Sequence, residues 1–68
     1  MPDSRLRITR RQVSELESQA DRQRALVAQL RAEGRPSEGA CSLLKGIENL
    51  LSSYQADLAR VEFEAGRQ

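Results

Sequence analysis

The chain has 68 residues, a formal net charge of +1, one cysteine and no histidine. A domain this small buries too little apolar surface to be comfortably stable without a covalent cross-link, a metal or a partner. A single cysteine excludes an intrachain disulfide, and without histidine there is little to complete a metal site. The fold must therefore rest on packing, with no cofactor expected, and association with another chain is an option from the start.

The composition is typical of long helices. Alanine, leucine, glutamate, glutamine and arginine dominate, and Tyr54 and Phe63 are the only aromatic residues. The N-terminal sequence MPDSRLRITRR lacks the apolar run of a signal peptide. No stretch approaches the roughly 20 apolar residues that cross a membrane. We expect a cytoplasmic, soluble protein without membrane contact.

Both halves of the chain show a heptad repeat, in which inward positions recur in alternating steps of three and four. In the first half these positions are Leu6, Thr9, Val13, Leu16, Ala20, Gln23, Val27 and Leu30. In the second half they are Ala40, Leu44, Ile47, Leu51, Tyr54, Leu58, Val61 and Ala65. The pattern predicts one helix over about 4–33 and another over about 38–65, each about 45 Å long.

The break between the two runs has the residues of a tight reversal. Gly34 suits the left-handed residue that ends a helix, and Pro36 cannot continue one. Ser37 can accept a hydrogen bond from the first free amides of the second helix. A turn over 34–37 has the length that joins antiparallel neighbours. We therefore expect residues 1–68 to form a single all-α domain, an antiparallel, coiled-coil-like two-helix hairpin.

Folding back aligns all eight layers of the two heptad patterns in one register. That register places Arg10 across from Glu62 and Arg24 across from Glu48 along one edge. Exposed pairs of this kind contribute about 0.2–1 kcal/mol each and mainly orient the helices. Gln23 is the polar exception at a core position. Its amide either specifies the register or reaches out to water, and we favour water.

The opposite edge carries exposed leucines. The register places Leu26 across from Leu43, with Leu50 one heptad farther along. A row of solvent-facing leucines usually marks a contact surface. The favoured partner is a second copy, which would give a homodimeric four-helix bundle. A different protein is the second option, and a surface without any partner is the third.

An arginine cluster near the N-terminus suggests an alternative function. Arg5, Arg7, Arg10 and Arg11 form the densest basic run and offer a possible nucleic-acid contact. Antiparallel folding brings Glu62 and Glu64 beside this cluster, which partly neutralises it. A nucleic-acid-binding hairpin is therefore the less favoured reading.

Catalysis is hard to build from these residues. Without histidine a nucleophile needs Lys45, Tyr54 or a carboxylate as its base, and none is spaced to meet a serine or Cys41 in a concave site. We expect no enzyme.

Cys41 has Arg31 as a possible cross-helix neighbour, so a redox role and a tolerated small residue are both open. Gly46 sits at an outward position of the second helix, which suggests close approach to something.

Residues 26–61 carry a pattern that resembles a class of short bacterial helical-hairpin proteins with no assigned function. The pattern is a helix ending in Leu-x-x-x-Gly, a polar turn with serine or threonine, and Ala-x-x-Leu-Leu opening a second helix. The matching residues here are Leu30, Gly34, Ser37, Ala40, Leu43 and Leu44. The resemblance implies a helical hairpin and supplies no activity or site residues. Together these observations predict a small, non-enzymatic module for protein–protein interaction or assembly.

Overall fold

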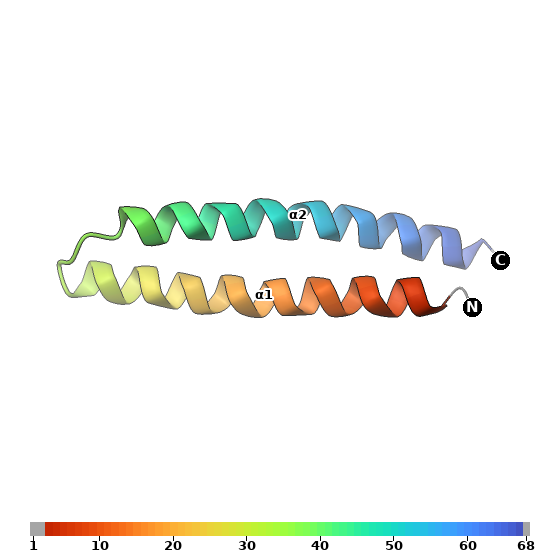
Figure 1. Cartoon of the computed structure of the whole chain (residues 1–68), viewed down its shortest axis with the longest axis horizontal. Helices are drawn as coiled ribbons and strands as arrows, with labels where there is room; N and C mark the ends of the chain where they lie inside the picture. The colour runs from red at the N-terminus through yellow and green to blue at the C-terminus, as the bar shows by residue number, and fades with distance from the viewer. Residues whose placement is uncertain (1–2, 68) are drawn as a thin grey trace.

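The computed structural model describes residues 3–67, which form two antiparallel α-helices joined by a short loop. Helix α1 spans Asp3–Ala32 and helix α2 spans Glu38–Gly66. The helices lie side by side, with the loop at one end and the start of α1 and the end of α2 at the other (Figure 1). Within the described residues there is no strand. The predicted all-α two-helix hairpin is confirmed.

The heptad positions form the seam between the helices. The buried residues are Val13, Leu16, Ala20, Val27, Leu51 and Val61. Leu44, Ile47, Tyr54 and Leu58 pack against the central part of this core. All remaining inward positions are half-buried except Ala65, which is exposed. The expectation for Ala65 is wrong because it lies in the last turn of α2, at the open end of the hairpin.

The loop reverses the chain through a left-handed glycine. Gly34 has a φ of 68°. This left-handed backbone conformation is unfavourable in free energy for any residue that has a Cβ atom. The N–H of Gly34 donates to the carbonyl of Arg31 at 3.1 Å, and the N–H of Arg35 donates to the carbonyl of Leu30 at 2.9 Å. These two bonds make a Schellman motif, which satisfies carbonyl groups that the end of α1 leaves free. The predicted role of Gly34 is confirmed.

Ser37 caps α2 through its backbone alone. Its side chain makes no capping hydrogen bond, so the predicted bond from a backbone amide to the hydroxyl oxygen is wrong. The backbone dihedrals of Ser37, φ −122° and ψ 5°, depart from the extended conformation of a side-chain N-cap. The carbonyl of Ser37 instead accepts a hydrogen bond from the N–H of Cys41 at 2.8 Å, which begins the helical ladder.

We expect Gly34→Ala to lower the free energy of unfolding by about 1 kcal/mol, because a Cβ atom disfavours the left-handed conformation. A Cβ atom at Gly34 would meet nothing within 4 Å, so the penalty is conformational rather than steric. Gly34→Asn should cost less, since asparagine tolerates this conformation. Urea unfolding followed by circular dichroism measures both variants. Equal stabilities for alanine and asparagine would contradict the turn geometry.

Candidate interaction surface

One edge of the hairpin is closed by ion pairs between the helices, and we call it the polar edge. Arg10 Nη2 lies 3.3 Å from Glu62 Oε2, and Arg24 Nη2 lies 3.0 Å from Glu48 Oε2. Both pairings are those predicted from the heptad register, so the register along this edge is confirmed. The pairs lie four turns apart on α1, and a slip of the helices by one turn would break both of them.

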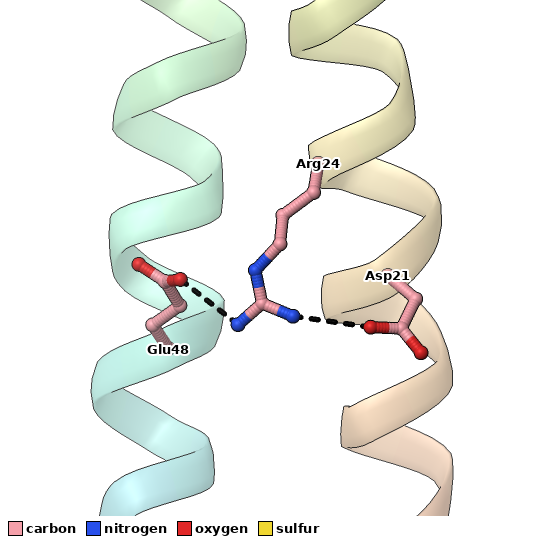
Figure 2. Close-up of polar contacts among 3 residues, drawn as sticks. All are labelled: Asp21, Arg24 and Glu48. Carbon is pink, nitrogen blue, oxygen red and sulfur yellow. Dashed lines mark hydrogen bonds and ion pairs between the residues drawn. The ribbon is translucent and has the colours of Figure 1, made fainter.

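Arg24 links the two helices with a single guanidinium group. Its Nη1 lies 3.1 Å from Asp21 Oδ1 of the same helix, while its Nη2 reaches Glu48 of α2 (Figure 2). The side chains of Arg24 and Glu48 are 49% and 42% exposed. Water screens a pair this exposed, so it orients the helices more than it stabilises them.

Cys41 lies on the polar edge, near the loop. Arg31 Nη2 donates to its sulfur at 3.5 Å, which confirms the predicted cross-helix neighbour. The thiol is free and the residue is half-buried. Its heptad position turns the sulfur away from the edge that carries the leucines.

Gln23 departs from the expectation. Its Nε2 donates to the carbonyl of Ala40 at 3.1 Å, and the residue is half-buried, so the favoured prediction that its amide reaches out to water is wrong. The small side chain of Ala40 leaves that carbonyl accessible to a neighbouring helix. The bond ties α1 to the backbone of α2 and satisfies an amide that would otherwise lose water without a replacement.

The opposite edge carries the leucines, and we call Leu26, Leu43 and Leu50 the leucine edge. Their exposed fractions are 43%, 57% and 47%. Apolar surface in contact with water is unfavourable, so burying these side chains against a partner would lower the free energy. The geometry of the hairpin leaves them uncovered because two helices enclose only the seam between them.

Sequence reasoning missed two further exposed apolar residues. Ile8 is 56% exposed on α1, and Phe63 is 66% exposed on α2. The guanidinium carbon of Arg67 lies 5.5 Å from the centroid of the Phe63 ring, which covers part of one ring face. Both residues fall outside the inward heptad positions, and the heptad assignment therefore already predicts that their side chains are exposed.

The arginine cluster is largely paired with carboxylates. The ion pairs are Arg5–Glu64 at 3.8 Å, Arg10–Glu62 at 3.3 Å and Arg11–Glu15 at 3.6 Å. This confirms that Glu62 and Glu64 lie beside the cluster. Within residues 4–67, Arg7 makes no ion pair.

Over residues 4–67, no group of three histidine, cysteine, aspartate or glutamate residues could hold a metal ion. Neither described helix combines the length and the apolar character needed to cross a membrane. An open, shallow depression on the outward side of α1 is lined by Ser14, Glu15, Ser18, Gln19 and Arg22.

Comparison of the chain with protein-family models, with curated proteins and with solved structures gives no match. The resemblance of residues 26–61 to a class of short bacterial proteins therefore stays a prediction. The arrangement of the chain's own residues is what any functional proposal must rest on.

A double-mutant cycle with Arg24→Gln and Glu48→Gln should give a coupling free energy of about 0.2–1 kcal/mol at low salt, because the pair is half exposed. At 1 M salt, where the Debye length is about 3 Å, the coupling should fall toward zero. Urea unfolding of the four proteins measures it. The matched control is a cycle between Arg22→Gln and Glu48→Gln, which should show no coupling; no coupling for Arg24 either would contradict the polar edge.

Proposed function

We propose that this chain is a cytoplasmic, non-enzymatic assembly module that binds a second copy of itself through the leucine edge. The observation that carries the proposal is the exposure of Leu26, Leu43 and Leu50 along one side of the hairpin. Fully burying a leucine contributes roughly 1.5–3 kcal/mol, so burying the half that each of these leucines still exposes contributes roughly 1 kcal/mol and supplies a driving force for association.

The area that the hairpin exposes supports a partner. Its accessible surface is 5231 Å² for 7.6 kDa, and it measures 54 × 14 × 12 Å. A compact monomer of this mass exposes about 4300 Å² by surface scaling, so the hairpin exposes about 900 Å² more. A standard protein interface buries about 800 Å² per partner. Association of two rods would remove an excess of this size.

A second copy is the simplest partner because one surface then serves both sides of a two-fold interface. Two hairpins packed in this way give a four-helix bundle. The ion pairs of the polar edge can stay in water in such a bundle, where they cost no desolvation. Binding to a different protein through the same edge is the competing outcome.

Nucleic-acid binding by the arginine cluster has weaker support. Three of its four arginines already pair with carboxylates of the hairpin, and a phosphate would have to displace those partners. The net charge of +1 supplies little additional attraction. Salt-dependent RNA or DNA binding, lost when Arg5, Arg7, Arg10 and Arg11 become glutamine, would favour this alternative over self-association.

The double variant Leu43→Glu, Leu50→Glu should be monomeric under conditions where the unaltered chain is a dimer, because four carboxylates would enter the interface. Sedimentation equilibrium measures the mass. The matched control is Ser52→Glu, Ala59→Glu, which adds the same charge to exposed positions on another face of α2 and should remain dimeric. A monomeric unaltered chain, or a dimer that survives both leucine changes, would overturn the proposal.

A further inference from the structure

One outward face of α2 carries no charged side chain over about four helical turns. Its members are all exposed and are Gly39, Leu43, Gly46, Leu50 and Ser53, which we call the uncharged face. The next row around the helix, with Ser42, Asn49 and Ala56, is uncharged as well. Charged residues make up 31% of the chain, so their absence here is a local feature. Depletion of charge is characteristic of the centre of an interface.

The corresponding outward rows of α1 differ. They hold the exposed residues Glu15 and Arg22, and the exposed Glu33 lies directly after the end of α1. Leu26 is the one leucine of α1 that lies beside the uncharged face. The outward surface with the lowest cost of desolvation therefore belongs almost entirely to α2.

We infer that α2 of one copy packs antiparallel against α2 of the second copy, with the two-fold axis close to Gly46. This inference rests on the proposed self-association and adds its geometry. A two-fold interface brings the same patch of both copies together. Because the patch lies on α2, the two α2 helices must meet each other rather than meeting α1 of the partner.

The direction follows from the ends of the uncharged face. Asp57 is exposed one turn beyond Ser53, on the same side of α2. A parallel pairing would place Asp57 and its ion-pair partner Arg60, 3.9 Å away, beside their own copies, so these charged groups would lie at the rim of an apolar contact and lose water. An antiparallel pairing about Gly46 instead sets Leu43 against Leu50 of the partner subunit and leaves Asp57 outside the contact. It also opposes the two helix dipoles.

Gly46 gives a second, independent reason for this axis. Glycine is among the least favourable residues inside a helix. A Cβ atom at Gly46 would meet nothing within 4 Å, and the backbone there has no positive φ, so the hairpin alone has no need of glycine. At the axis of two packed helices, the missing side chain allows the backbones to approach closely.

Cysteine cross-linking tests the geometry in a Cys41→Ser background. Gly46→Cys should form a disulfide-linked dimer under mild oxidation, because positions near a two-fold axis approach within the 4.4–6.8 Å Cα separation that a disulfide needs. Ser53→Cys is the matched control, one heptad away on the same face. In an antiparallel pair its two copies lie about 20 Å apart along the helices and should not link, whereas in a parallel pair they would meet.

Cross-linking at position 46 alone supports the inference. Linking of both variants, or of neither, overturns it. Sedimentation equilibrium of the cysteine-free protein distinguishes failure of the geometry from failure of self-association. If the protein is a dimer but links at neither or at both positions, only the antiparallel geometry is contradicted. If it is a monomer, the proposed function is contradicted as well.

A bulky residue at the axis gives a check that does not depend on oxidation. Gly46→Leu should raise the dimer dissociation constant at least tenfold while increasing the helix content of the monomer, since leucine is a better helix former. Ser52→Leu places the same side chain on another exposed face of α2 and should leave the constant within about twofold. An unchanged constant for Gly46→Leu would overturn the inference.

Discussion

The register in which α1 packs against α2 governs every surface that this hairpin presents. The apolar seam holds the helices together. Its residues are mostly small or branched aliphatic side chains of similar size, so the seam alone specifies the register of the two helices only weakly. The loop and the polar edge restrict that freedom. Gly34 sets where the chain turns, and Arg10–Glu62 and Arg24–Glu48 join particular residues across the seam. A slip by one turn would break these pairs and move the leucines away from one another.

The two edges of the hairpin differ in chemistry: one carries ion pairs and the other carries exposed apolar side chains. The polar edge satisfies its charges internally, so it has little to gain from a partner. The leucine edge and the uncharged face of α2 have no such compensation within one chain. The proposed association uses the second side because of this asymmetry, and it would leave the ion pairs of the polar edge in solvent.

At two positions where the sequence-based expectation was wrong, a backbone group takes the place of the expected group. Gln23 was expected to reach water and bonds to the carbonyl of Ala40 instead. Ser37 was expected to cap α2 with its hydroxyl group and does so only with its backbone. Heptad positions report which side of a helix a residue occupies, but they carry no information on the path of a flexible side chain or on the dihedral angles of a cap. Ile8 and Phe63 lie outside the inward heptad positions, so the repeat that predicts the exposed leucines predicts the exposure of these two residues as well.

The sequence by itself determined the two helices, the reversal at Gly34, the ion pairs of the polar edge and the exposure of Leu26, Leu43 and Leu50. Each of these follows from periodicity or from the conformational preference of one residue, both of which are local properties of the chain. The tertiary structure decided the bond from Gln23 to α2, the backbone cap at Ser37 and the exposure of Ala65. These depend on distances between groups on different segments or on where packing stops, and only the folded chain sets those quantities.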